Sequence, residues 1–279
     1  MYRIVKKETL NPSVNLYEIE APMTAKTAQP GQFVILRSHK DGERIPITIH
    51  DCDREKGTVT IIVQTVGAAT ERLRHMEQGE FLEDFVGPLG RPTEIEGNKK
   101  VCVIGGGVGC AIAYPVLKKF HDCGAEVHAI AGFRNRDMVI LEEKFRSVSD
   151  LFRLCTDDGS YGEKGLVTDA LRDLLGKGHF YDQVIAIGPL VMMKFVALTT
   201  EEYGIPTTVS MNPIMVDGTG MCGGCRLTVG GETKFACVDG PDFDGHLVDW
   251  DESLKRSRMY ADWERHKYSQ TCNLFRKEA

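Results

Sequence analysis

Three cysteines and an aspartate near residue 220 have the spacing of ligands for an iron–sulfur cluster. The segment reads Asp217-Gly-Thr-Gly-Met-Cys222-Gly-Gly-Cys225, and Cys237 lies further along the chain. Plant-type [2Fe–2S] proteins use C-x4-C-x2-C and a distant fourth cysteine, and here Asp217 stands where the first cysteine is expected. The glycines let a loop wrap closely around a cluster and direct backbone N–H groups at its sulfurs. The pattern predicts a [2Fe–2S] site held by Asp217, Cys222, Cys225 and Cys237.

Other interpretations of these cysteines are open. A Cys-x2-Cys pair also suits structural zinc, but such a site usually takes a second pair, and only Cys237 follows. Free thiols in a flexible loop would be the simplest alternative, although three cysteines among so many glycines are hard to place by chance. The fourth ligand is also open, because Cys272 or a water could replace Asp217. A carboxylate oxygen is a harder ligand than a thiolate and should shift the cluster potential.

A second glycine-rich segment, Gly105-Gly106-Gly107-Val108-Gly109, follows a short apolar strand predicted at 101–104 and opens a helix that runs to about residue 120. A dinucleotide-binding turn needs this context, because its glycines let the backbone approach a pyrophosphate and the helix N-terminus supplies positive potential. A tight structural turn is the alternative. The strand–helix alternation around the segment favours nucleotide binding.

The residues that would select NAD or NADP are ambiguous. No acidic residue for the ribose follows the next predicted strand, whereas Arg134 and Arg136 could pair with a 2′-phosphate or be solvated loop charges. Asp158 follows a predicted strand at 151–155, at a carboxyl end where ligands bind in sheets of this kind. An ordinary polar turn explains Asp158 equally well.

The elements that must position these residues fall into successive regions. Short alternating segments at 2–7, 14–20, 32–38, 45–50, 58–64 and 80–86, with one short helix at 68–75, predict a small antiparallel β-barrel. Strands at 101–104, 126–131, 151–155, 183–187 and 207–210 alternate with helices, including 166–175 and 191–203, which predicts a doubly wound parallel sheet. Residues 211–245 show little periodicity, with a hairpin turn expected at Gly230-Gly231. The charged end of the chain, predicted to be helical, has too few apolar positions for its own core and should pack on another module or a partner chain.

Composition limits the class of protein. The net charge of −6 comes from 34 basic and 40 acidic residues with no basic stripe, which argues against nucleic acid as the main partner. We see no apolar signal segment and no run long enough for a transmembrane helix, which predicts a cytoplasmic protein with reduced thiols. Five scattered cysteines are expected to be small buried hydrophobes rather than ligands: Cys52, Cys102, Cys110, Cys123 and Cys155.

With barrel, nucleotide domain and cluster loop in this order, the whole chain resembles the ferredoxin–NADP reductase superfamily. It looks like the electron-transfer subunits of dihydroorotate dehydrogenase, and closer still to the small (alpha) subunits of NADH-dependent ferredoxin:NADP oxidoreductases of the sulfide dehydrogenase type. Asp217 in place of a cysteine favours the second group. The motifs that carry the resemblance are Arg44-Ile-Pro-Ile-Thr48, Gly87-Pro-Leu-Gly90, Gly105–Gly109, Gly188-Pro189 and the cluster segment.

The resemblance implies four regions: an FAD-binding β-barrel at 1–96, an NAD(P)-binding α/β domain at 97–210, a small [2Fe–2S] cluster-binding region at 211–248 and a charged, helical C-terminal tail at 249–279. It also implies the residues that bind flavin, with Thr48 and Ile47 in the Ser and Tyr positions of an Arg-x-Tyr-Ser-like segment and Arg44 one residue early. Ile47 and Val66 could instead simply pack in the barrel. The implied flavin residues are Arg44, Pro46, Ile47, Thr48, Gln64, Val66, Gly67 and Thr70, and the implied nucleotide residues are Gly106, Gly107, Gly109, Arg134, Asp158, Gly188 and Pro189.

By the same resemblance the chain is an oxidoreductase subunit that moves electrons between NAD(H), FAD and a [2Fe–2S] cluster. Hydride would pass between the nicotinamide and the flavin, and single electrons would pass on to the cluster, so no catalytic acid or nucleophile is expected. The implied partner is a larger flavin and [4Fe–4S] subunit that forms a heterodimer, handles ferredoxin and NADP(H), and carries the bifurcating flavin. The alternatives are an electron-transfer subunit of another enzyme, such as dihydroorotate dehydrogenase, a zinc-stabilised, non-redox nucleotide-binding protein, and a self-sufficient reductase, against which the charged tail after Asp249 argues.

Overall fold

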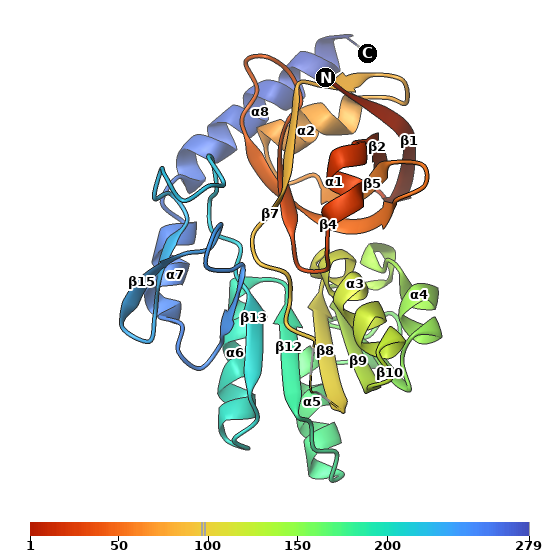
Figure 1. The fold of residues 1–279 in the computed structure, drawn as a ribbon, viewed down its shortest axis with the longest axis vertical. Helices are drawn as coiled ribbons and strands as arrows, with labels where there is room; N and C mark the ends of the chain where they lie inside the picture. The colour runs from red at the N-terminus through yellow and green to blue at the C-terminus, as the bar shows by residue number, and fades with distance from the viewer. Residues whose placement is uncertain (96, 98, 279) are drawn as a thin grey trace.

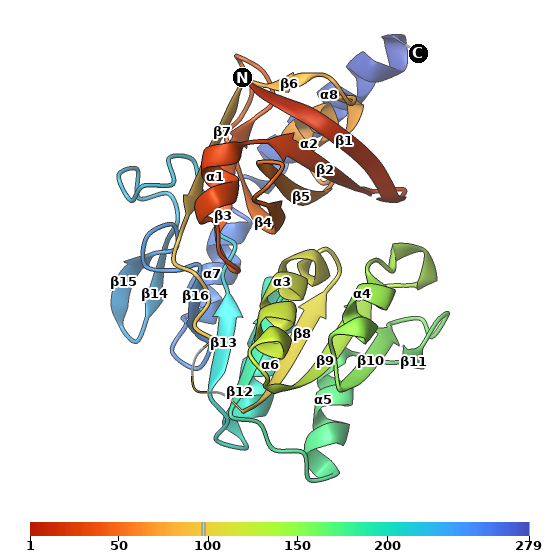
Figure 2. The same ribbon diagram turned by 45° about the vertical axis from the view of Figure 1, so that its right-hand side comes forward.

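The computed structural model describes residues 1–95, 97 and 99–278, so the predicted barrel end at residue 96 and chain end at residue 279 lie outside the described residues. Figure 1 shows a barrel above an α/β domain, with the C-terminal elements along one side of both. The turned view in Figure 2 separates the two sheets and shows that helix α3 lies directly beneath the barrel. The arrangement places the predicted nucleotide turn next to the predicted flavin strand.

The N-terminal region forms an antiparallel sheet that wraps into a nearly closed barrel around a core that includes Tyr17, Leu36 and Phe85. In the described chain its strand order is β6-β1-β2-β5-β4-β3-β7. The strands are β1 Tyr2–Asn11, β2 Val14–Glu20, β3 Phe33–Arg37, β4 Ile45–Asp53, β5 Thr58–Gln64, β6 Phe81–Leu82 and β7 Asp84–Leu89, and the helices are α1 Pro22–Thr27 and α2 Ala68–His75. This confirms the predicted barrel. Helix α1 was not predicted, because six residues are too few to show a helical period.

The second region is the predicted doubly wound domain, which confirms the fold class. Within the described residues its sheet has the order β11-β10-β9-β8-β12-β13-β16, and all neighbours run parallel except β13 and β16. The strands are β8 Lys100–Gly106, β9 Glu126–Phe133, β10 Leu151–Thr156, β11 Glu163–Lys164, β12 Gln183–Ile187, β13 Thr207–Ser210 and β16 Asp242–Asp244. The helices are α3 Gly109–Asp122, α4 Glu142–Ser147, α5 Val167–Gly176 and α6 Leu190–Glu201, with a 3-10 turn η1 at Arg136–Met138.

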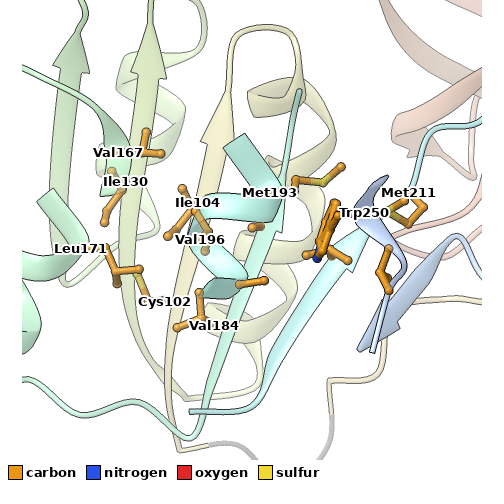
Figure 3. Packing of buried hydrophobic residues seen from close by; sticks show 14 of the residues in the cluster. Cys102, Ile104, Ile130, Val167, Leu171, Val184, Met193, Val196, Met211 and Trp250 are labelled. Atoms are coloured by element: carbon orange, nitrogen blue, oxygen red, sulfur yellow. The ribbon is translucent and has the colours of Figure 1, made fainter. Parts of the chain in front are cut away.

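The cysteine-bearing region shares the core of the α/β domain. It contains a hairpin of β14 (Arg226–Val229) and β15 (Glu232–Phe235), turning at the predicted Gly230-Gly231, and the helix α7 (Trp250–Ser257). Cys225, Cys237 and Trp250 belong to the same buried cluster as residues of β8, β12 and α6. Figure 3 shows Trp250 close to Met193 of α6 and to Met211. The cluster region is therefore anchored on the α/β domain through one continuous hydrophobic core.

The last helix, α8 (Ala261–Glu278), runs along the barrel and packs on α2, as both ribbon views show. The rings of His75 and Phe275 stack with centroids 3.7 Å apart, and Thr271 is buried. The charged C-terminal segment thus covers a face of the barrel within this chain.

All nine cysteines lie among the described residues and none forms a disulfide. Cys102, Cys110 and Cys155 are buried as expected, and Cys52 is half-buried. The prediction was wrong for Cys123, which is exposed because it stands at the C-terminal end of α3. Among residues 1–95, 97 and 99–278, none of the helices combines the length and apolar character needed to cross a membrane.

Candidate cofactor-binding sites

The Gly105–Gly109 turn joins the end of β8 to the start of α3. Gly107 has φ +56°, in the left-handed region that favours glycine, and its N–H donates to the Gly132 carbonyl at 2.8 Å. A Cβ at Gly109 would overlap the carbonyl oxygen of Ile187 and lie 2.8 Å from the Cα of Gly188. The turn therefore requires glycine both for its conformation and for the close approach of α3 to β12.

Gly188 and Pro189 lie beside this turn, because Ile187 of β12 is paired with Gly105 of β8. A Cβ at Gly188 would lie 3.1 Å from the Cα of Gly106. The structure thus brings two separate predicted motifs together at the carboxyl edge of the parallel sheet, where ligands of such sheets bind. The amino-terminal end of α3 opens at the same edge and contributes positive potential.

Arg134 and Asp158 also reach this edge, at the ends of β9 and β10. The backbone N–H of Asp158 donates to the Arg134 carbonyl at 3.3 Å. The Oδ1 of Asp158 accepts hydrogen bonds from the hydroxyl and the backbone N–H of Ser160, at 2.6 and 2.9 Å, and these bonds lower the pKa of the carboxyl group. These contacts are those of a polar turn, so this oxygen of Asp158 is already engaged.

The predicted flavin segment Pro46–Thr48 forms the start of β4, with all three residues half-buried. Thr48 pairs with Phe33 and Ile47 with Val34 in the ladder with β3. Ile47 packs partly against the barrel core. Because β4 and β5 are antiparallel, the start of β4 and the end of β5 at Gln64 lie at the same end of the barrel.

The second predicted flavin segment caps helix α2. The N–H groups of Val66 and Gly67 donate to Oγ1 of Thr70 at 2.9 and 3.0 Å, and this hydroxyl donates to the Gly67 carbonyl at 2.9 Å. Val66 is 70% exposed, so the alternative of simple barrel packing is wrong for this residue. An exposed valine beside an ordered helix start leaves an apolar surface next to polar backbone.

One buried histidine ties the flavin strand to the nucleotide domain. His50 lies two residues after Thr48, and its Nδ1 is 2.7 Å from the carbonyl oxygen of Ala111 in the first turn of α3. Its ring stacks on Tyr114, with centroids 5.4 Å apart, and its Nε2 is 3.3 Å from Nζ of Lys144. Burial lowers the pKa of His50 to about 4, although the bond to the Ala111 carbonyl opposes this shift. Sequence reasoning missed this contact, because a lone histidine in a strand carries no signal for its partner.

The predicted cluster segment is a partly exposed loop in which three glycines are in the left-handed region: Gly218 has φ +88°, Gly220 +88° and Gly223 +66°. This winding turns backbone N–H groups toward sulfur, as the sequence suggested. The N–H of Gly224 lies 3.5 Å from Sγ of Cys222, and together with the N–H groups of Asp217 and Val216 it lowers the pKa of the thiol. The loop favours the thiolate form that a cluster requires.

Cys225 and Cys237 are both buried and interact with each other. Burial, together with the neighbouring Cys225 thiol, raises the pKa of Cys237. Among the described residues, no group of three or more His, Cys, Asp and Glu side chains is arranged to hold a single metal ion. A [2Fe–2S] cluster spreads its ligands over two irons, so its ligands need not converge on one point. The donor set and the sulfur-directed amides fit such a cluster.

Asp217 makes contacts within its own loop. Its Oδ2 accepts hydrogen bonds from Oγ1 and N of Thr219, at 2.6 and 2.8 Å, and from N of Met221 at 3.3 Å, and these bonds lower the pKa of the carboxyl group. Cys272, the alternative fourth ligand, lies in a groove with Glu71 and Arg74 between α2 and α8. Asp217 is therefore the better placed of the two residues.

Arg44, predicted to bind flavin, has a different partner in the structure. Its Nε donates to the carbonyl oxygen of Val216 at 2.8 Å, and its Nη1 lies 3.3 Å from Oδ2 of Asp84. The arginine thus links the start of β4 to the residue before Asp217.

Two grooves of the surface lie away from these turns and strand ends. A groove of about 650 Å³ separates the β4–β5 hairpin from α3, with Arg54 and Lys118 among its lining residues. Another of about 400 Å³ lies between α2 and α8. Apart from Cys272 in the second groove, neither is lined by a predicted cofactor residue.

Known proteins are similar to this chain in sequence. A family model for the iron–sulfur cluster binding domain of dihydroorotate dehydrogenase B matches residues 212–249. The dihydroorotate dehydrogenase B (NAD(+)) electron transfer subunit homolog of Thermotoga maritima is 48% identical over 265 residues, covering 95% of this chain and 93% of that protein. An uncharacterized protein encoded in the adh 3′ region of Clostridium beijerinckii is 54% identical over 268 residues, covering 93% and 90%.

Solved structures agree. A chain of the NADH-dependent reduced ferredoxin–NADP oxidoreductase, a structure described for its insights into flavin-based electron bifurcation, superposes with a TM-score of 0.92 at 45% identity and covers 97% of each chain. The ferredoxin reductase of carbazole 1,9a-dioxygenase, at 18% identity and a TM-score of 0.60, covers 74% of this chain and 65% of that one and shares the fold. The chain therefore belongs to the family of dihydroorotate dehydrogenase B electron-transfer subunits and their homologues, and it is an electron-transfer subunit of an oxidoreductase.

Proposed function

We propose that this chain is the electron-transfer subunit of a flavin-based, bifurcating ferredoxin:NAD(P) oxidoreductase. It would move electrons between NAD(H), FAD and a [2Fe–2S] cluster, and on to a larger flavoprotein subunit. One observation carries the proposal: side chains close to the predicted flavin segment of the barrel contact both the nucleotide domain and the cluster loop. His50 reaches the helix of the nucleotide turn, and Arg44 reaches the cluster loop.

The chain's own residues would bind and orient the cofactors. A bound FAD would supply the hydride and single-electron chemistry that connects the nicotinamide nucleotide with the cluster. The Gly105–Gly109 turn offers backbone N–H groups and a helix N-terminus to a pyrophosphate. Residues 46–48 and 64–70 offer an apolar strand and a helix start to the flavin. Cys222, Cys225 and Cys237, with Asp217, offer ligands to the cluster.

The choice of nucleotide and of system has separate support. The similar structure is of an NADH-dependent enzyme, and its likeness extends over 97% of this chain. Asp217 in place of the first cluster cysteine also favours this system. We therefore propose NAD(H) as the nucleotide, even though Arg134 and Arg136 could pair with the 2′-phosphate of NADP(H).

The proposed partner is a larger flavin and [4Fe–4S] subunit, with which the chain forms a heterodimer and through which it reaches ferredoxin and NADP(H). Bifurcation would take place at the flavin of that subunit. A tagged copy of this chain, purified anaerobically from its own cells, should retain a larger iron-containing flavoprotein in equal amount. A cytoplasmic location is part of the proposal, and the nine unpaired cysteines support it.

The first experiment is a visible spectrum of anaerobically purified protein, with iron, zinc and flavin measured on the same sample. The proposal predicts about two irons and one FAD per chain, in line with one [2Fe–2S] cluster, and absorbance that NADH bleaches. Zinc without flavin would contradict the proposal and favour a non-redox nucleotide-binding protein.

A second candidate is the electron-transfer subunit of a dihydroorotate dehydrogenase, which the names of several relatives favour. The retained partner distinguishes the two. A partner that oxidises dihydroorotate would support this candidate, whereas one that carries [4Fe–4S] clusters and oxidises NADPH would support the first.

A further inference from the structure

Two arginines of the barrel region hold backbone carbonyls on both sides of the cluster ligands. The Nε of Arg44 donates to the carbonyl of Val216 at 2.8 Å, and the Nε of Arg91 donates to the carbonyl of Val238 at 3.1 Å. Val216 is the residue before Asp217, and Val238 is the residue after Cys237. The two contacts therefore bracket the cluster-binding segment.

Arg44 is itself fixed in place by other groups of the barrel. Asp84 of β7 accepts from Arg44 at 3.3 Å and from Nε of Arg37 at 2.7 Å. The side chains of Arg44 and Asp84 are 31% and 28% exposed, so both are largely shielded from water. A guanidinium with one side on a carboxylate and the other on a carbonyl has little freedom to move.

Arg91 is held mainly through its backbone. Its N–H donates to the Gly240 carbonyl at 2.7 Å, and its guanidinium is 3.9 Å from Asp239. The Arg91 side chain is 70% exposed, so its contribution should be smaller than that of Arg44.

The beginning of the cluster loop also packs directly against the barrel. A Cβ at Gly218 would lie 2.8 Å from Leu89 and 3.0 Å from Ile35, both on barrel strands. In contrast, the polar contacts of Asp217 stay within the loop. The backbone of the segment thus depends on contacts that come from the barrel.

We propose that Arg44 and Arg91 are positioning residues that clamp the cluster-binding segment to the barrel and so fix the path between flavin and cluster. The inference rests on the proposed function, because it takes the segment to hold a cluster. Groups outside the ligand shell commonly orient metal ligands, and a shift of the site by a fraction of an ångström weakens its chemistry. Electron transfer between two bound groups falls steeply with their separation, so a loosened segment should slow the step.

The test is hydrogen exchange on the purified holoprotein. The amides of Thr219, Met221 and Gly224 are hydrogen-bonded within the loop and report its opening. Arg44→Gln should speed their exchange about fivefold, because one hydrogen bond of ordinary strength, weakened by partial exposure to water, is lost. Arg37→Gln is the matched control, because Arg37 also pairs with Asp84 but makes no hydrogen bond to the cluster loop. In this variant the loop amides should exchange at the wild-type rate.

Arg91→Gln tests the other end of the clamp. Exchange should rise about twofold to fivefold at Val238 and Asp239, whose amides are bonded to the Phe235 carbonyl, and remain unchanged at Thr219. In the same variant, stopped-flow absorbance should show cluster reduction by NADH slowed relative to flavin reduction. A destabilised protein without the clamp effect would instead show faster exchange throughout.

The outcomes separate the clamp from the proposed function. Unchanged loop exchange in Arg44→Gln, in protein with full iron and flavin content, overturns the clamp. If Arg44→Gln does not fold, Asp84→Asn should loosen the same amides to a smaller degree, and no change there overturns it too. A wild-type protein without iron or flavin would remove the proposed function, whatever the exchange shows.

Discussion

The two glycine-rich segments of this chain use glycine for different reasons. At 105–109 the backbone is pressed between a strand and a helix, and Gly109 has no room for a Cβ because Ile187 and Gly188 lie against it. In the cluster loop, Gly218, Gly220 and Gly223 are needed because they have positive φ. Space for a Cβ is limited at Gly218 by Leu89 and Ile35, but at Gly223 the nearest atom would be 3.7 Å away.

Their attachments to the barrel differ in the same way. The nucleotide turn is tied down through His50, which is 2% exposed and whose pKa is lowered by burial. The cluster loop is tied down by partly exposed arginines that donate to carbonyl groups. The nucleotide turn is thus attached through a buried contact, whereas the cluster loop is attached through contacts that are partly open to water. Four predictions can sharpen or break this comparison.

The largest effect is expected at Gly109. Gly109→Ala should lower the free energy of unfolding by about 3 kcal/mol, because the new methyl group meets backbone atoms of β12 that cannot rotate away. Gly106→Ala is the matched control, since its Cβ would meet chiefly the flexible sulfur end of Met192 and should cost much less. Chemical denaturation followed by circular dichroism measures both. Equal losses in the two variants would show that packing does not distinguish the glycines.

His50 predicts a pH dependence. Its folded-state pKa of about 4 lies below the ordinary value of 6.5, so the unfolded chain binds the proton more tightly. The contribution of neutral His50 to the free energy of unfolding is therefore fully present above pH 6.5 and is lost as the pH falls toward 4. The loss should be about 2 kcal/mol between pH 7.5 and 5. The stability of His50→Gln should lack this part of the pH dependence, and His121→Gln, at an exposed position of helix α3, is the control. An identical slope in wild type and His50→Gln would contradict the prediction.

A smaller effect is expected in the cluster loop. Gly220→Ala forces a side chain into φ +88°, which costs about 1 kcal/mol of backbone strain. Gly224→Ala is the control, since its Cβ would have ordinary contacts at 3.5 and 3.6 Å. The loss of visible absorbance in the presence of an iron chelator should be about fivefold faster in Gly220→Ala, in proportion to that strain. A slower or equal rate would mean that winding of the loop does not limit cluster retention.

Of the four sites, Asp217 is the one where substitution should change the stability of the protein least. The expected effect is on the absorbance spectrum and redox potential of the cluster. Asp217→Asn keeps an oxygen that can accept the bonds from Thr219 and Met221, but it removes the anionic ligand. Asp217→Cys supplies a thiolate and should retain a cluster whose potential is changed, because a soft ligand replaces a hard one. Redox titration of the cluster measures both variants. A normal potential and spectrum in both would show that Asp217 is a loop cap and not a ligand.

Much of the fold follows from local patterns. Period-two alternation predicted the barrel strands, and alternation of strands with helices predicted the parallel sheet. The strand β16 could not be predicted, because its three residues pair with β13 only after the intervening cluster region has folded back. Helix α1 was missed for its shortness, and Cys123 was misjudged because residue type alone does not show which side of a helix end faces water.

The sequence by itself determined which segments can approach cofactors, since glycine spacing, strand ends and cysteine intervals are local properties. Only the tertiary structure decided how these segments are joined. The hydrogen bond between His50 and Ala111 joins residues 61 positions apart, and the one between Arg44 and Val216 joins residues 172 positions apart. Neither contact leaves a periodic or compositional signal, because a hydrogen bond between distant residues requires only that the folded chain bring one donor to one carbonyl.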